Sequence, residues 1–214
     1  ALYSARYIKS EETTTNSFHL VSDLADNLIS EVYVSTKETA TDQISPAGQN
    51  MPSITIDEAF GYEFVAGPDI FRMANDLDTE TNFFKAKLTY YQNNHKITAG
   101  YENTVYDTYN LFIINEDGSF EFDDLAALQA GQIGSYSASG SKTGDVNDAA
   151  ANFEYELSSM YIMDEYTISD AMTLTYGVRY DEYSGDDTPT NAAFQNEYGF
   201  KNGGLKGTDL FTYR

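Results

Sequence analysis

The chain has 214 residues, of which 34 are acidic and 12 are basic, so its formal net charge is −22. Such an acidic surface excludes a nucleic-acid ligand, because phosphate binding needs a basic face. The absence of cysteine and the presence of only 2 histidines exclude a disulfide framework, a thiolate metal site and a histidine-based zinc site. No apolar run approaches the length of a transmembrane helix.

Apolar and polar side chains alternate with a period of two along much of the chain. This period is typical of a strand with one apolar and one polar face. The alternation predicts strands at residues 2–9, 17–25, 28–37, 81–92, 95–107, 153–168 and 171–182.

Short polar turns separate three pairs of these strands, at Asp26-Asn27, at Asn93-Asn94 and at Ser169-Asp170-Ala171. Asparagine suits such turns because it tolerates a positive φ. Long loops are predicted between the pairs, at residues 38–80, 108–150 and 183–214. Within the loops we expect a short strand at 53–58, a hairpin of 111–114 with 119–122, and a helical turn at 123–129.

The predicted hairpin between residues 153 and 182 is compatible with two classes of β protein. Its arms have about ten residues or more, which suits a tilted membrane-spanning strand and also fits a large soluble β-sandwich. Short turns on one rim and long loops on the other are typical of an outer-membrane barrel, whereas a sandwich has short connections at both ends. The 18 tyrosines and 13 phenylalanines suit the aromatic girdles of such a barrel. We therefore predict an all-β, antiparallel up-and-down β-barrel with long extracellular loops.

Several stretches resemble TonB-dependent outer-membrane receptors of the Oar-like subgroup. The text YIMDEYTISDAMTLTYGVRYDEY, which begins at Tyr161, resembles a barrel-strand signature of that family. Residues 67–79 and 95–102 are similar to a loop-to-strand segment and to an H-x-(I/L)-x-x-G-x-E strand of the subgroup. Downstream, Pro189, Asn191, Phe194, Tyr198 to Phe200 and Asn202 follow its spacing, so the resemblance covers roughly residues 67–211.

The resemblance implies a barrel of 22 strands around a plug domain, which imports scarce nutrients with energy passed through TonB. The predicted strands are too few to close such a barrel. We therefore expect this chain to be an internal section of a longer receptor, located in the outer membrane. Its expected partners are outer-membrane lipid, lipopolysaccharide and, through a plug domain, the TonB system.

Few residues suggest a specific site, and nothing suggests an enzyme. Arg179 and Asp181 are expected to form an ion pair facing the lumen, on the same face as Glu154 and Glu156. Carboxylates that can supply oxygen ligands to Ca²⁺ are Asp117, Asp123, Asp124, Asp186 and Asp187. Polar turn chemistry explains the same residues, since none follows the spacing of an EF-hand loop.

Four aromatic residues in or near a predicted outer loop can stack on a sugar or a flat ligand. They are Tyr106, Tyr109, Phe112 and Phe120, for which loop packing or a rim girdle is the alternative explanation. An alternative function for the whole chain also stays open. A secreted or surface-attached β protein can self-associate through strand edges, or bind glycans, and would be extracellular.

Overall fold

A computed structural model describes residues 6–46, 50–59, 61–141, 143–185, 192–199 and 208–213. Long strands dominate the described residues, and helices are short. The strands are β1 (Ile8–Ala25), β2 (Leu28–Ile44), β3 (Ser53–Ala59), β4 (Tyr62–Ala66), β5 (Ala74–Gln92), β6 (His95–Ile113), β7 (Ser119–Phe122), β8 (Ser135–Ser137), β9 (Ala151–Ser169), β10 (Met172–Gly185) and β11 (Thr208–Tyr213). The helices are η2 (Ile70–Arg72), α1 (Leu125–Ala130), η3 (Val146–Ala149) and α2 (Ala192–Tyr198).

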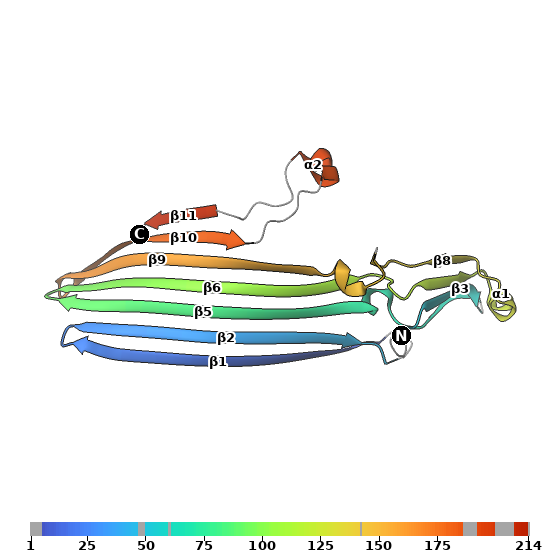
Figure 1. Ribbon diagram of the computed structural model, residues 1–214, viewed down its shortest axis with the longest axis horizontal. Coiled ribbons are helices and arrows are strands. Elements are labelled where there is room, and N and C mark those ends of the chain that lie inside the picture. Colours follow the sequence, from blue (N-terminus) through green and yellow to red (C-terminus); the bar gives the residue numbers. More distant parts are fainter. Residues whose placement is uncertain are drawn as a thin grey trace. The chain divides into compact units, whose positions relative to one another are not determined.

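Seven strands form one large sheet in the order β1-β2-β5-β6-β9-β10-β11 (Figure 1). The strands of this sheet lie side by side in the same order as they occur along the chain, as an up-and-down topology requires. The registers of β9 with β10 and of β10 with β11 are antiparallel. The predicted all-β antiparallel class is confirmed, and the described strands form an open section of barrel wall with β1 and β11 at its edges.

The three predicted turns join β1 to β2, β5 to β6 and β9 to β10. Asn93 takes a φ of 53°, the left-handed conformation that asparagine tolerates in tight turns. The Tyr91 N–H donates to the Asn27 carbonyl at 2.9 Å, and the Thr167 N–H donates to the Asn94 carbonyl at 2.9 Å. Neighbouring turns are thereby held at the same rim of the sheet.

The strands are longer than the alternation predicts. Residues 2–9 and 17–25 were expected to be separate strands. Residues 2–5 lie outside the described part of the chain, and Ile8–Ala25 is one continuous strand. The polar stretch between them contains three successive threonines, which are β-branched and favour a strand. Thr13 Oγ1 lies 3.2 Å from Thr39 Oγ1 of β2, so pairing continues where the apolar pattern has ended.

The C-terminal region contains a strand that the sequence did not predict. Residues 183–214 were expected to be a loop, but Thr208–Tyr213 pairs with β10 from Val178↔Tyr213 to Tyr183↔Thr208. The six residues give too short an alternation to identify alone, whereas the exposed edge of β10 provides the hydrogen-bonding partners that order them.

The two long connections between the hairpins build a second sheet, in the order β4-β3-β7-β8. Strands β3 and β4 come from the first connection, and β7 and β8 come from the second. They meet through a parallel register that runs from Ser53↔Ser119 to Ile56↔Phe122. The predicted hairpin of residues 111–114 with 119–122 is therefore wrong, because β7 finds partners distant in sequence.

The chain divides into two compact units. We call Ala1–Thr13, Thr39–Thr79 and Thr108–Asn152 the cap unit, because it holds the small sheet and the two long connections. We call Thr14–Glu38, Glu80–Asp107 and Phe153–Arg214 the wall unit, because it holds the three tight turns. Long strands of the large sheet contribute residues to both units.

Within the wall unit, the Tyr161 side chain lies directly over Gly100 of the neighbouring strand β6. A Cβ at position 100 would fall on the Tyr161 ring. Glycine at this position therefore creates the space into which the tyrosine ring packs, as expected where a side chain closely approaches a neighbouring backbone.

We predict that Gly100→Ala destabilises the protein by about 1–3 kcal/mol, because overpacking forces the ring out of its position. Urea unfolding of the protein in lipid vesicles measures the change. Gly140→Ala is the matched control, since a Cβ at that position meets no atom within 4 Å. A double-mutant cycle with Tyr161→Ala should remove most of the cost, and equal costs with and without the ring would contradict this packing.

Candidate functional site

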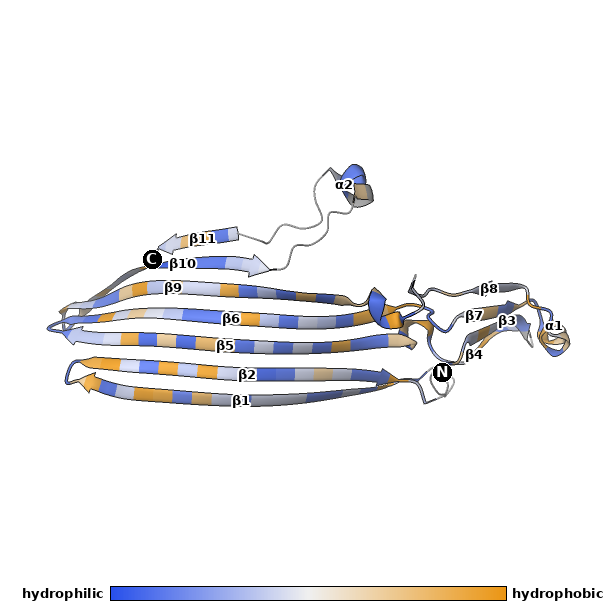
Figure 2. Cartoon of the chain, in the orientation of Figure 1, coloured by the Kyte–Doolittle hydropathy of each residue, from blue (hydrophilic) through white to orange (hydrophobic). Residues whose placement is uncertain are grey.

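One face of the large sheet carries an apolar band next to the tight turns. Ring contacts, hydrogen bonds and strand registers place alternate residues of successive strands on this face. Figure 2 shows the same concentration in the halves of β1 and β2 that adjoin their shared turn. The band consists of Phe18, Leu20 and Leu24 in β1, Val32 and Val34 in β2, Phe84 and Leu88 in β5, Ile97 and Tyr101 in β6, Met160 and Ile162 in β9, and Met172, Leu174, Tyr176, Val178 and Tyr180 in β10.

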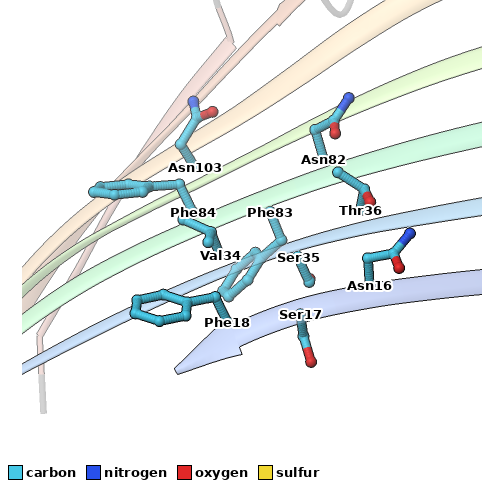
Figure 3. Close-up of a pocket in the computed structure, with 10 residues that line it drawn as sticks. All are labelled: Asn16, Ser17, Phe18, Val34, Ser35, Thr36, Asn82, Phe83, Phe84 and Asn103. Atoms are coloured by element: carbon cyan, nitrogen blue, oxygen red, sulfur yellow. The ribbon is translucent and has the colours of Figure 1, made fainter. Parts of the chain in front are cut away.

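The band ends along a line that crosses the strands. A hollow of about 420 Å³ on this face shows the change (Figure 3). On three strands an apolar lining residue is followed, two positions further from the tight turn, by a polar lining residue. The pairs are Phe18 and Asn16 in β1, Val34 and Thr36 in β2, and Phe84 and Asn82 in β5. Because the change from apolar to polar side chains occurs at the same level on three neighbouring strands, it indicates that the surroundings of this face change there from apolar to aqueous.

The height of the band matches the hydrocarbon core of an outer membrane. On β10 it runs from Met172 to Tyr180, which at about 3.3 Å per residue is about 26 Å along the strand. A strand tilt of about 40° reduces this to a little over 20 Å, close to the roughly 25 Å apolar band of outer-membrane barrels. The outward face of the wall unit, which carries this band, therefore has the dimensions expected of a lipid-facing surface.

The opposite face of the wall unit carries paired charges. The Glu31 carboxylate of β2 forms ion pairs with two lysines of β5. Its oxygens lie 2.8 Å from Lys85 Nζ and 2.7 Å from Lys87 Nζ. Lys96 of β6 lies 2.7 Å from Glu165 of β9. Ion-paired side chains on the inward face are typical of a water-filled lumen and would be costly against lipid.

Arg179 is the centre of the largest of these networks. Its Nε lies 2.8 Å from Asp181, and its two terminal nitrogens contact Glu102 at 3.2 Å and the Ser159 hydroxyl at 2.8 Å. The predicted Arg179–Asp181 ion pair is confirmed. The expectation that Glu156 shares this face is wrong, because it opposes Ser184 in the register and accepts from Asn103 on the outward face.

One carboxylate, Asp164, lies inside the outward band, opposite Tyr176 in the register of β9 with β10. Asp164 is 8% exposed, and its Oδ2 lies 2.7 Å from the Tyr176 hydroxyl and 2.7 Å from His95 Nδ1. The His95 ring stacks on Tyr166 with ring centroids 4.3 Å apart. Aromatic and hydrogen-bonding partners thus shield this carboxylate within the apolar band.

We predict that Leu88→Arg, in the middle of the band on β5, costs about 2–4 kcal/mol of unfolding free energy, because arginine is expensive at the bilayer midplane. Asn82→Arg, on the same strand and face but beyond the boundary, should cost about 1 kcal/mol or less. Denaturant unfolding in lipid vesicles compares the two variants. Similar costs for both would show that the band is not the lipid contact.

Asn115 joins several elements of the cap unit. Asn115 has a φ of 61° and donates its backbone N–H to the Ile70 carbonyl at 2.7 Å. Its side-chain amide donates to the Ser137 carbonyl at 3.0 Å and to the Ser119 hydroxyl at 3.2 Å. One residue therefore connects the end of β6 with η2, β7 and β8. Ala74, Leu111 and Ile113 form a small buried core beneath it.

Four carboxylates line a polar hollow of about 490 Å³ in the cap unit: Asp42, Asp76, Glu116 and Asp117. Burial, followed by the hydrogen bond and the charge of Asp117, raises the pKa of Glu116. Burial, followed by the charges of Asp78 and Asp42, raises the pKa of Asp76. The hollow is thus a region of strong negative potential.

A raised pKa means that the folded cap binds protons more tightly than the unfolded chain, so ionisation of Glu116 opposes local folding at neutral pH. We predict that Glu116→Gln slows hydrogen exchange of the cap amides at neutral pH by a factor equivalent to at most about 1 kcal/mol. The difference should vanish as the pH falls below the ordinary pKa of glutamate. A benefit that persisted in acid would mean that charge is not the cause.

The structure does not gather the proposed calcium ligands. Asp124 instead caps α1, where it accepts from the Ala127 N–H at 2.7 Å. Asp123 is exposed, and Asp186 and Asp187 lie outside the described residues. In the described part of the chain, no three acidic or histidine side chains are close enough to hold a metal ion. Calcium binding stays a prediction that this geometry does not support.

The four candidate aromatic residues also lie apart. Tyr106, Tyr109 and Phe112 belong to strand β6, not to a loop, because β6 continues to Ile113. Tyr106 stacks on Tyr155 with ring centroids 4.5 Å apart, and the Tyr109 hydroxyl donates to Asn147 at 2.7 Å.

Only Phe120 lies in the small sheet, with its ring centroid 4.7 Å from that of Tyr136. The exposed aromatic residues Tyr62, Phe64 and Tyr136 of this sheet were missed. For Tyr62 and Phe64 the sequence signal is a short alternation at 62–66, which does not extend to Tyr136.

An up-and-down antiparallel sheet with a lipid-facing band, an ion-paired inner face and short turns on one rim defines a section of an outer-membrane β-barrel. Comparison with protein families agrees, since residues 6–206 match the family described as outer membrane beta barrel domain. The chain belongs to this family and is an outer-membrane protein. No curated protein and no solved structure gives a significant match. None of the helices in the described residues is long and apolar enough to cross a membrane.

Proposed function

We propose that the chain is part of the barrel of a TonB-dependent receptor of the Oar-like kind, which takes up a scarce nutrient. The observation that carries the proposal is the ion-paired inner face, centred on Arg179 and on Glu31, because a polar inner face suits a wide lumen in contact with water or with a plug domain. The resemblance of residues 161–183 and 95–102 to that subgroup supports it.

The role we infer is binding and transport, without catalysis. The wall unit contacts outer-membrane lipid and lipopolysaccharide through its apolar band. The cap unit holds the long connections, which in outer-membrane barrels lie on the cell surface, where a ligand is first met. Energy would reach the receptor through a plug domain and the TonB system.

The full-length protein in its native cells tests this proposal. Deletion of its gene should abolish high-affinity uptake of one nutrient during limitation, and dissipating the proton gradient of the inner membrane should abolish it equally. Growth and radiolabel uptake across a panel of scarce nutrients measure both effects. Energy-independent uptake, or no uptake defect together with loss of surface attachment, would contradict a TonB-dependent receptor.

The second outcome would favour a surface adhesin that binds glycans or associates with other copies. The observation behind this alternative is the set of exposed aromatic side chains in the cap unit, such as Tyr62 and Tyr136. Binding of whole cells to immobilised glycans, lost in the deletion strain, would then identify the adhesive function.

A further inference from the structure

The small sheet of the cap unit ends in an open strand, β4. In the described part of the chain, β4 pairs with β3 alone, and the strand at the opposite edge, β8, has only three residues. A terminal strand presents a row of backbone N–H and carbonyl groups to solvent. Four of the five β4 residues are exposed, and Tyr62 is 79% exposed.

The two faces of β4 differ in chemistry. Phe64 opposes Ile56, which in turn opposes Phe122, so the face that carries Phe64 and Tyr62 is apolar across the sheet. Val65 opposes Thr55, which opposes Glu121, so the face that carries Glu63 combines one apolar side chain with polar and acidic ones. A segment lying alongside β4 would meet aromatic side chains on one face and a carboxylate on the other.

The edge of β4 is only partly protected, by its short length and by one charged side chain, Glu63. Natural edge strands are commonly blocked by lysine or proline, and the sequence of β4, YEFVA, contains neither. Its surroundings are strongly negative, since the residue ranges of the cap unit contain 16 acidic and 4 basic residues. Charge complementarity therefore selects a cationic partner.

We propose that β4 binds an extended cationic peptide, which adds to the small sheet as a further strand. Strand addition takes its affinity from backbone hydrogen bonds and its specificity from alternate side chains. The preferred peptide alternates apolar residues, which lie beside Tyr62 and Phe64, with lysine or arginine, which lie on the Glu63 face. This inference rests on the proposed function, for which it names the class of ligand.

Synthetic peptides of about seven residues, the length of an ordinary strand, test the binding mode on the full-length protein in detergent. The first alternates valine or tyrosine with lysine, and the second has the same composition with its lysines in one block. The third is the alternating peptide with N-methyl groups on every second residue, which removes backbone donors and keeps the charge. Fluorescence anisotropy should show at least about tenfold weaker binding of the second and third peptides. Equal binding of all three would overturn strand addition and leave only non-specific charge attraction.

Variants of the protein locate the site. Glu63→Lys should weaken binding of the alternating peptide at least about tenfold, because it places like charges together. Tyr62→Ala should weaken binding without changing its salt dependence. Glu12→Lys makes the same charge change at an exposed residue of β1 in the same unit and should have little effect. Equal losses for Glu63→Lys and Glu12→Lys would overturn the assignment to β4.

The peptide-binding assay needs no energy source, so its result can contradict the β4 site without contradicting the transport proposal, and the reverse. Peptide binding without energy-dependent uptake would support the β4 site and contradict the receptor function. Energy-dependent uptake of another nutrient, with no binding of the alternating peptide, would overturn the β4 site alone. Hydrogen-exchange protection at Asn115 checks that each variant keeps the cap folded.

Discussion

The structure depends on one constraint, which is that backbone hydrogen-bonding groups cannot remain unpaired in hydrocarbon. Long neighbouring strands meet this constraint because they pair their backbone groups with each other. Successive side chains of each strand then point to opposite faces of the sheet, which have different environments. The wall unit shows both consequences in a single strand, where Leu88 faces outward and Lys87 faces Glu31. The acidic composition and the low mean hydropathy of the chain are compatible with a membrane protein because only alternate residues of the wall contact lipid.

The parts of the fold that depend on local patterns could be predicted from the sequence. The three turns, the strands that adjoin them and the Arg179–Asp181 pair all follow from alternation and turn chemistry within about twenty residues. The band boundary was also present in the sequence, since Phe84 is followed toward the loops by Asn82. It became visible only when strand pairing aligned this step with the same step in β1 and β2.

The missed parts depend on partners distant in sequence. The polar segment of β1 is a strand because β2 lies beside it, and Thr208–Tyr213 is a strand because β10 offers an edge. The parallel pairing of β3 with β7 joins residues more than sixty positions apart, and no periodic pattern in the sequence predicts it. The candidate aromatic residues, and the calcium candidates that the structure describes, lie on different elements for the same reason, since residues near each other in a predicted loop belong to separate strands, turns and helices.

The pairing of the two long connections has a consequence for the energy of recognition. A mobile loop that closes on a ligand loses conformational entropy of roughly 1–2 kcal/mol per ordered residue. In the cap unit, the parallel register and the Asn115 hydrogen bonds have already fixed much of both connections, so this loss has occurred during folding. A partner that meets this surface would find a rigid template, and its association would be governed by shape and charge with little loop rearrangement.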